Sequence, residues 1–303
     1  MIKIPTVLIL RAGSSNQLGY PLGRSLISEL CQQPQSPNDD DLLFGRWKSS
    51  EIKELIKGLS RGVYDSIDAF LEEQPKHLEL GRFLIARQLK QHEEVDRLFL
   101  PHDSGWYRYL FSKLIEDDKH ADRIGENALS IITFNYDRSL ECFLHEAIQS
   151  RCHLSSDESA ERLKLIQIIH PHGILGAYPQ IPYGKEASAD ELSEIARGIK
   201  IIHELEHAGT GYCAPEFETA NELLRKAERI LFLGFGFHAD NMRRFNFFKL
   251  DALKGKEVKG TVLGLGSADL NDLITRLEMF GIQRDMLNGN GCDGFFSHVT
   301  RLR

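Results

Sequence analysis

The chain has 303 residues, of which 42% are hydrophobic and 27% charged, a balance typical of folded globular proteins and unlike collagen-like, coiled-coil or disordered chains. The formal net charge of −7 lacks the basic excess that a nucleic-acid backbone attracts, so we expect no direct nucleic-acid binding. No apolar run reaches the roughly 20 residues of a membrane-spanning helix, and Arg11 closes the first apolar run too early for a signal peptide. We therefore expect a cytoplasmic protein with no membrane partner.

The cysteines are widely scattered and form no Cys-x-x-Cys pair. Their odd number and wide spacing argue against a disulfide framework and against a zinc ribbon, so we expect no bound metal. The five are Cys31, Cys142, Cys152, Cys213 and Cys292.

The first expected element is a strand over residues 6–10, a continuous β-branched and aliphatic run. A loop rich in glycine and serine follows, and residues 21–27 are typical of the start of a helix. Two prolines and three aspartates then break the pattern. Periodic apolar positions beyond them predict a helical subdomain inserted over residues 36–126, within a single domain over 1–303.

Short apolar runs alternate with helical patterns in the rest of the chain. This alternation predicts an α/β fold with a Rossmann-like, mainly parallel sheet and helices on both faces. In such sheets the ligand lies beyond the carboxyl ends of the strands. Strands are expected over residues 128–134, 165–169, 198–202, 229–233 and 260–265, and helices over 137–149, 189–197, 217–227 and 269–280.

The loop after the first strand is the first candidate ligand site. Its small residues would let backbone N–H groups approach a pyrophosphate near a helix N-terminus. A glycine loop after a strand is as often only a tight turn. The candidate cofactor-binding residues in this loop are Ala12, Gly13, Ser14, Gly19, Tyr20 and Pro21.

Distinctive residues also follow later strands. Thr133, Asn135 and Asp137 come after the second strand, where an aspartate is also a common helix cap. The third strand leads into His-Pro-His-Gly at residues 170–173, where we expect the glycine to turn the chain sharply and leave the His172 ring accessible; a lone histidine there is more often structural. Further candidate cofactor contacts beyond the last two strands are Gly234, Gly236, Gly266 and Ser267.

Taken in order, these motifs resemble the sirtuin superfamily, specifically the prokaryotic SIR2-like domains of antiphage defence. Residues 11–15 resemble the family's Gly-Ala-Gly-x-Ser loop, with an arginine in place of the first glycine, and residues 19–21 resemble its Gly-x-Pro turn. The Thr-x-Asn-x-Asp signature is matched by Thr133, Asn135 and Asp137.

Other segments extend the resemblance. Leu140 and Glu141 follow the signature as they do in the family, and His172 with Gly173 matches its His-Gly pair. Residues 20–23 and 66–71 look like the SIR2-like branch rather than the histone-type deacetylases. The resemblance spans about residues 5 to 270.

The resemblance implies a site that binds NAD⁺ as a substrate and cleaves the bond between nicotinamide and ribose. Such cleavage passes through an oxocarbenium-like transition state and needs positioned polar groups more than a strong nucleophile. Carried over by position, Asn135 would orient the ribose and the attacking water, His172 would act as a base on the ribose hydroxyls, and Asp137 would line the nicotinamide pocket. We expect His170 to matter less than His172.

The resemblance also bears on the acceptor and the partners. Sirtuin deacetylases carry a four-cysteine zinc module beside an acyl-lysine cleft, and this chain offers no candidate for it. Water is then the expected acceptor, which makes the protein an NAD⁺ hydrolase. In SIR2-like defence proteins this activity depletes NAD⁺ under the control of homo-oligomerisation, a partner ATPase or another defence protein.

Two other functions stay open. His203, Glu204 and His207 satisfy the His-Glu-x-x-His pattern of zinc peptidases, although a strand over 198–202 would not bring the two histidines together. The second is a catalytically silent sensor or scaffold that binds NAD or ADP-ribose. It follows from Arg11, because a side chain at the tight turn costs free energy if φ is positive there, and Arg11→Gly should then improve binding. A guanidinium could instead pair with the pyrophosphate.

Overall fold

The computed structural model describes residues 1–32, 45–100, 105–116, 121–184, 186–201, 215–235, 237, 253–263, 266–278, 287–289, 291–298 and 300–302. At its centre lies a six-stranded parallel sheet with the strand order β3-β2-β1-β4-β5-β6. The strands are β1 (Thr6–Leu10), β2 (Leu129–Thr133), β3 (Gln167–Ile169), β4 (Arg229–Leu233), β5 (Glu257–Thr261) and β6 (Leu287–Asn288). The expected Rossmann-like α/β fold is confirmed.

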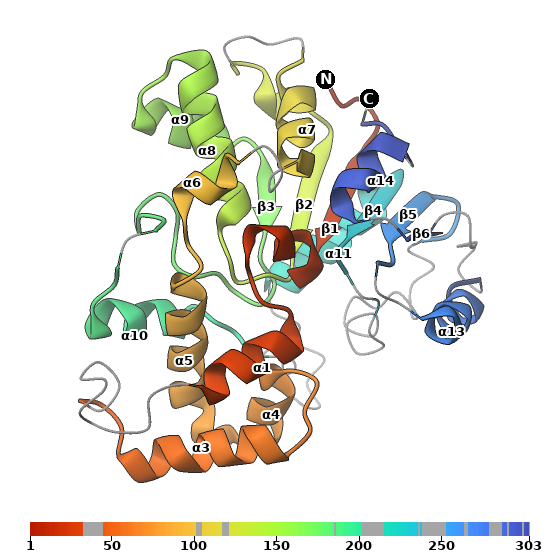
Figure 1. Cartoon of the computed structure of the whole chain (residues 1–303). Coiled ribbons are helices and arrows are strands. Elements are labelled where there is room, and N and C mark those ends of the chain that lie inside the picture. The colour runs from red at the N-terminus through yellow and green to blue at the C-terminus, as the bar shows by residue number, and fades with distance from the viewer. Residues whose placement is uncertain are drawn as a thin grey trace.

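Two hydrophobic clusters cover the two faces of the sheet, and β1 contributes to both. Leu8 and Leu10 face one cluster, whereas Val7 and Ile9 face the other, as the alternation of side chains along a strand requires. Helices α7 (Gly105–Leu114), α8 (Ser139–Cys152) and α14 (Cys292–His298) cover the first face, with α9 (Ser156–Leu163) beside α8. Helices α11 (Pro215–Lys226) and α13 (Ser267–Glu278) cover the second (Figure 1).

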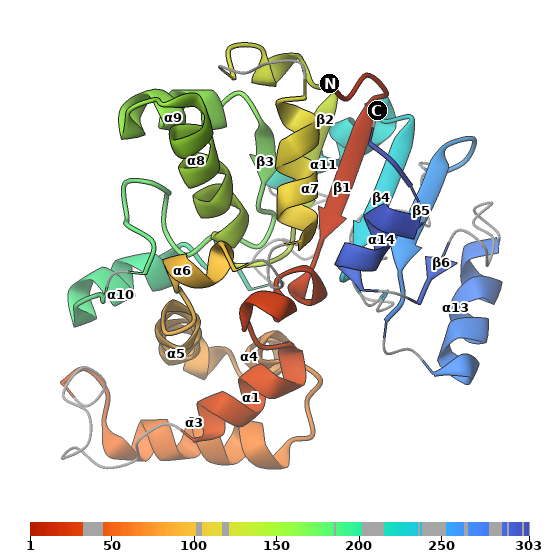
Figure 2. The same cartoon turned by 45° about the horizontal axis from the view of Figure 1, so that its top comes forward.

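The remaining helices form a lobe below the carboxyl edge of the sheet, the edge to which the strand arrows point (Figure 2). In α3, buried residues recur at Ile52, Leu55, Ile56 and Leu59, which places them on one face of the helix. They belong to the same cluster as Leu8 and Leu10, so lobe and sheet share one core. The lobe consists of α1 (Gly23–Cys31), α3 (Ser49–Arg61), α4 (Ile67–Glu73), α5 (Leu78–Lys90) and α10 (Ala189–Arg197), with α6 (Val95–Leu98) leading back towards the sheet.

Helix α7 belongs to the segment 36–126 that we expected as an insertion, yet it packs on the sheet face against α8 and α14. Within the part of the chain that the structure describes, no helix has both the length and the apolar character needed to cross a membrane.

The expected helices over 189–197, 217–227 and 269–280 are present within two residues of their predicted bounds. The expected strand over 198–202 is wrong in its described part. Gly198 ends α10, and Ile199 forms only an isolated antiparallel bridge with Gly173. Ile199 and Ile201 are buried in the core although they belong to no strand, so their β-branched side chains imitated the pattern of one.

The last predicted strand, over 260–265, starts too late, because β5 covers Glu257–Thr261. Its charged side chains hid it from an apolar pattern: Glu257 pairs with Arg229 at 2.7 Å and with Lys259 at 2.8 Å. Strand β6 was not expected, since two residues give no periodic signal.

A buried ion cluster ties the lobe to the sheet and was not anticipated. The side chains of Arg138 and Glu93 are both fully buried. The guanidinium donates to the two Glu93 oxygens at 2.8–2.9 Å and to the backbone oxygen of Ile181 at 2.6 Å. Glu93 also pairs with Lys90 and accepts a hydrogen bond from Gly184 N at 3.1 Å. The cluster thus joins the segment after α5, the start of α8 and the loop at 181–184.

We predict that Arg138→Met lowers the free energy of unfolding by about 3–5 kcal/mol, because it leaves the Glu93 carboxylate buried without its main partner. Urea denaturation measures this loss. The matched control is Arg123→Met, which breaks the exposed pair with Glu126 at 2.6 Å and should cost about 0–1 kcal/mol. Equal losses in the two variants would contradict the role assigned to the cluster.

Candidate functional site

The connections between strands reverse their direction between β1 and β4. The chain runs from β1 outwards to β2 and β3, and then returns to β4 beside β1 before it continues outwards to β5 and β6. This reversal is the topological switch point at which doubly wound α/β proteins bind ligands. Leu10 is in register with both Thr133 and Leu233, so the loops that follow the three strands begin side by side.

Two glycines bring the loops after β1 and β4 into backbone contact. Gly13 N donates to Gly234 O at 3.1 Å. A Cβ on Gly234 would lie 2.0 Å from Ser14 N, and the φ of Gly234 is +61°, in the left-handed region that favours glycine. A Cβ on Gly13 would lie 2.7 Å from Gly234 Cα. Close packing of the two loops is therefore a sufficient structural reason for both glycines.

The Asp137 carboxylate connects the loop after β1 to the start of α8. Its two oxygens accept hydrogen bonds from Ser15 Oγ at 2.9 Å, from Ser139 N at 3.1 Å and from the Ser139 hydroxyl. Burial raises the pKa of Asp137 above its ordinary value, while the hydrogen bonds from Ser139 and Ser15 act in the opposite direction. The carboxylate thus binds the first N–H of α8 and the Ser15 hydroxyl of the glycine loop, and its expected place in a nicotinamide pocket stays a prediction.

The Asn135 side chain lies beside the serines of the loop after β1. Its amide nitrogen donates to Ser14 Oγ at 3.3 Å and to Ser15 Oγ at 3.2 Å, and its backbone N donates to Thr133 Oγ1 at 3.2 Å. Among the described residues, nothing donates to its side-chain oxygen. The structure thus fixes the amide and presents one polar acceptor at the carboxyl edge of the sheet.

The His170 ring links the Asn135 backbone to α8. Its Nδ1 lies 3.0 Å from the backbone oxygen of Asn135, and its Nε2 lies 2.5 Å from Glu141 Oε1 on α8. Both nitrogens face acceptors, which fits a doubly protonated ring that donates to each. Burial acts to lower the pKa of His170, but the Glu141 carboxylate and the Asn135 carbonyl outweigh it and raise the pKa above its ordinary value. His170 therefore has a defined role in positioning the Asn135 backbone.

His172 is less open than the sequence suggested. We expected an accessible ring, but the residue is only 5% exposed. Its ring centroid lies 5.1 Å from that of Phe134 and 6.1 Å from that of Phe217. Gly173 does make the expected turn, with a φ of +82°. The ring is buried because Phe217 on α11 packs against it at the end of β3. This contact joins distant segments, so no local pattern reveals it.

The other predicted contacts differ in how far they are exposed. Thr133 and Tyr20 are buried, and the Tyr20 hydroxyl lies 2.7 Å from that of Tyr183, so both side chains serve the interior. Partly exposed backbone around the loop after β1 belongs to Ala12, Gly13, Gly19 and Pro21, with Ser14 buried beneath it. Gly266 and Ser267 are exposed at the start of α13. Gly236 lies outside the described residues.

Residues of α7 and α14 also contact the loop after β1 and the start of α8. Trp106 Nε1 donates to Ser14 O at 2.9 Å, and the Tyr107 hydroxyl lies 2.7 Å from Ser139 Oγ. Asp293 on α14 accepts from Trp106 N at 2.7 Å and from Gln17 Nε2 at 3.3 Å. None of these contacts could be predicted from a local pattern, because each joins segments at least 32 residues apart in the sequence.

Arg11 does not carry the backbone strain that we expected. Its φ of −143° and ψ of 177° are extended, so an arginine adopts them without cost. Burial raises the pKa of Tyr136 above its ordinary value, and the charge of Arg11 acts in the opposite direction. The prediction that Arg11→Gly improves NAD⁺ binding therefore loses its physical reason.

Within the described part of the chain, no group of three His, Cys, Asp or Glu side chains is placed to hold a metal ion. The candidates His203, Glu204 and His207 lie outside the described residues, as does Cys213. Since residues 199–201 are not a strand, the strand-based objection to the zinc motif no longer holds.

The chain is thus a Rossmann-like α/β protein with polar groups gathered at the switch point of its sheet. Neither the family models nor the curated proteins compared with this chain give a match.

We predict that His170 stabilises the fold more at low pH than at high pH. Because its pKa is raised in the folded state, the stabilisation is complete below the ordinary value of about 6.5 and is lost as the pH rises through the folded value. The difference in unfolding free energy between the wild type and His170→Asn, from urea titrations, should therefore be larger at about pH 6 than at about pH 9. His153→Asn, at an exposed position, is the control. A His170→Asn difference that is constant or grows with pH would contradict the charged pair.

Proposed function

We propose that the protein is an NAD⁺ glycohydrolase, which cleaves NAD⁺ to nicotinamide and ADP-ribose with water as the acceptor. The observation that carries the proposal is the Asn135 amide, fixed on the hydroxyls of Ser14 and Ser15 at the switch point. The resemblance of the ordered motifs to SIR2-like defence domains supports it. By the same resemblance, we propose that the enzyme depletes NAD⁺ in antiphage defence, as a homo-oligomer or with a partner ATPase.

Asn135 would orient the reaction. Its amide nitrogen is occupied by the two serines, so its side-chain oxygen is the group that would accept a hydrogen bond from a ribose hydroxyl or from the attacking water. Holding such an acceptor in place before the reaction is the main way in which a protein stabilises charge that develops in a transition state. Ser15 and Asp137 keep the amide from turning.

His172 would act as the base on a ribose hydroxyl. His172 follows the carboxyl end of β3, and Asn135 follows the carboxyl end of β2. These two strands pair in parallel, so both residues lie at the same edge of the sheet. An imidazole suits this task near neutral pH. The substrate's adenosine diphosphate would lie along the loop after β1, where Gly13 and Gly234 bring backbone close together.

We place the enzyme in the cytoplasm. The cysteines that the structure describes, Cys31, Cys142, Cys152 and Cys292, are all free thiols, as proteins of reducing compartments usually have.

Two observations favour a second candidate, the silent sensor or scaffold that binds NAD or ADP-ribose. His172 is only 5% exposed, and Asp137 is already occupied by three hydrogen bonds. If neither side chain can contact the substrate, the loop backbone would bind a dinucleotide without cleaving it.

We predict that Asn135→Ala and His172→Ala each reduce nicotinamide release from NAD⁺ at least about 100-fold, the usual loss when a positioning or base group is removed. Chromatography of the released nicotinamide measures it. Asn221→Ala on α11 is the matched control and should keep full activity. Wild-type protein that binds NAD⁺ but releases no nicotinamide, alone or as an oligomer, would favour the sensor.

We predict that the purified protein holds no zinc, which elemental analysis measures directly. One equivalent of zinc, lost together with the activity in His203→Ala and His207→Ala, would replace the proposal with a zinc peptidase.

A further inference from the structure

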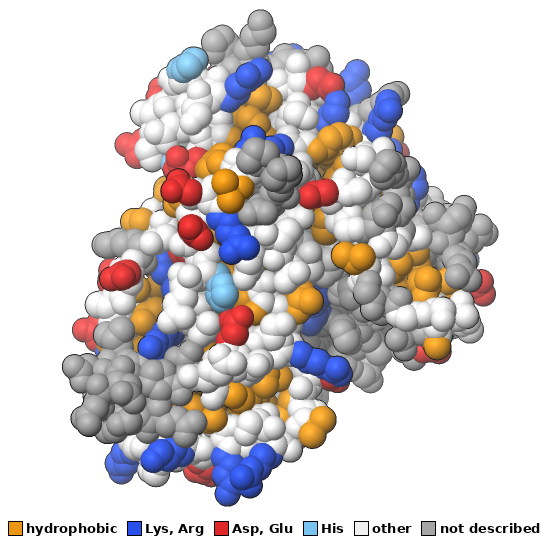
Figure 3. Space-filling view, in the orientation of Figure 1, with side chains coloured by type: hydrophobic (Ala, Val, Ile, Leu, Met, Phe, Trp, Pro, Cys, Tyr) orange, Lys and Arg blue, Asp and Glu red, His pale blue; other side chains and the backbone are white. Residues whose placement is uncertain are grey.

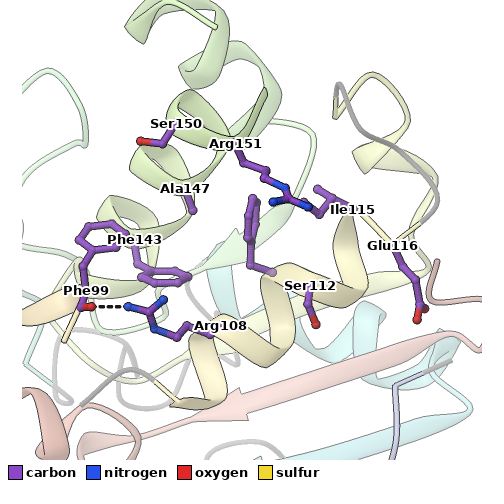
Figure 4. A pocket seen from close by; sticks show the side chains of 10 residues that line it. Phe99, Arg108, Ser112, Ile115, Glu116, Phe143, Ala147, Ser150 and Arg151 are labelled. Atoms are coloured by element: carbon purple, nitrogen blue, oxygen red, sulfur yellow. Dashed lines mark hydrogen bonds between the residues drawn. The ribbon is translucent and has the colours of Figure 1, made fainter. Parts of the chain in front are cut away.

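A cavity of about 550 Å³ opens between α7 and α8, on the sheet face that these helices cover. Figure 4 shows it from close by. Its apolar wall is formed by Phe99, Phe111, Ile115, Phe143 and Ala147. None of these residues belongs to the candidate site at the carboxyl ends of the strands. We refer to it as the α7–α8 cavity.

The apolar wall presents aromatic surface in an ordered arrangement. Phe99 and Phe143 stack with ring centroids 5.2 Å apart and an interplanar angle of 21°. Phe111 meets Phe143 nearly edge-on, at 6.5 Å and 88°. Offset stacks and edge-to-face pairs are the arrangements that aromatic rings prefer, so this wall suits another flat ring. The volume lies within the range of pockets that hold small organic molecules.

Positive charge lines the rim on both sides. Arg108 comes from α7 and Arg151 from the end of α8. The Arg108 guanidinium donates to the backbone oxygen of Phe99, which holds it beside the stacked rings (Figure 4). Arg151 extends across the cavity towards Ile115 in the same view. The surface over these helices shows hydrophobic and basic side chains together (Figure 3).

The one acidic residue on the rim does not cancel this charge. Glu116 pairs with Lys113 at 2.5 Å and with the N-terminal amine at 3.7 Å. Its negative charge is therefore balanced by cations outside the cavity. A cavity with two arginines in a chain of net charge −7 is a local exception to the overall sign.

We propose that the α7–α8 cavity is a binding site for a small organic anion with an aromatic body. The aromatic part lies on the Phe99 and Phe143 rings, and the carboxylate, sulfonate or phosphate is bound by Arg151 and Arg108. Guanidinium groups bind such oxyanions through two parallel hydrogen bonds and also stack on flat rings. The Ser112 hydroxyl donates to Tyr109 O at 2.7 Å, so its oxygen stays available as an acceptor at the rim. This site is separate from the proposed NAD⁺ site and does not depend on that function.

The test compares two fluorescent probes that share an aromatic body. Anilinonaphthalene sulfonate carries an anion, whereas N-phenylnaphthylamine has nearly the same rings and no charge. Titration of the folded protein should give an affinity for the sulfonate at least about tenfold higher, because charged hydrogen bonds favour it. Equal affinities would overturn the proposal.

Variants then locate the probe. Arg151→Gln should weaken sulfonate binding about tenfold and leave the uncharged probe unchanged, since only the anion loses a charged partner. Ala147→Phe fills the cavity and should weaken both probes. Arg197→Gln, an exposed arginine on α10, is the control and should change neither. Arg151 is exposed, so its variant tests the proposal even if Ala147→Phe does not fold. Sulfonate binding that is unaffected in Arg151→Gln would place the probe elsewhere and refute the assignment.

Discussion

The buried Asp137 carboxylate is the contact on which the rest of the site depends. It joins three segments that are distant in the sequence: the loop after β1 through Ser15, the start of α8 through Ser139, and α7 through the Tyr107 hydroxyl on Ser139. A buried carboxylate is costly without hydrogen bonds, so these partners must all be present in the folded state. Asn135 takes its position from the same Ser15 hydroxyl. The hydrogen bonds of the Asp137 carboxylate therefore determine how the side chains at the switch point are arranged.

The lobe contributes to this site rather than standing apart from it. The Tyr136 hydroxyl, between Asn135 and Asp137, donates to Asp68 on α4 at 2.6 Å. Arg138, directly after Asp137, is held by Glu93 at the end of the segment that follows α5. Lobe residues thus hold the chain on both sides of Asp137. A change in how the lobe packs would therefore alter the position of the backbone next to Asn135. The shared core of lobe and sheet holds this backbone in place.

The central strands could be predicted from the sequence, because β1, β2 and β4 are short and mainly apolar runs. The order of the site motifs could also be predicted, because two serines follow β1, an amide and a carboxylate follow β2, and two glycines follow β4. What could not be predicted depends on contacts between distant segments. Phe217 covers His172, and Asp293 supports the loop after β1, with no local pattern in either case. Local propensity also misled: the β-branched residues at 199 and 201 are in the core without joining the sheet.

We propose above all that a dinucleotide binds at the carboxyl ends of β1 and β2, next to the Asp137 network. Hydrogen–deuterium exchange of the wild-type protein with and without saturating ADP-ribose tests it most directly, because the product is not consumed and both the hydrolase and the sensor would bind it. We expect slower exchange in residues 11–20 and 133–141 when ADP-ribose is bound. Protection confined to other segments, or none at either loop, would contradict it.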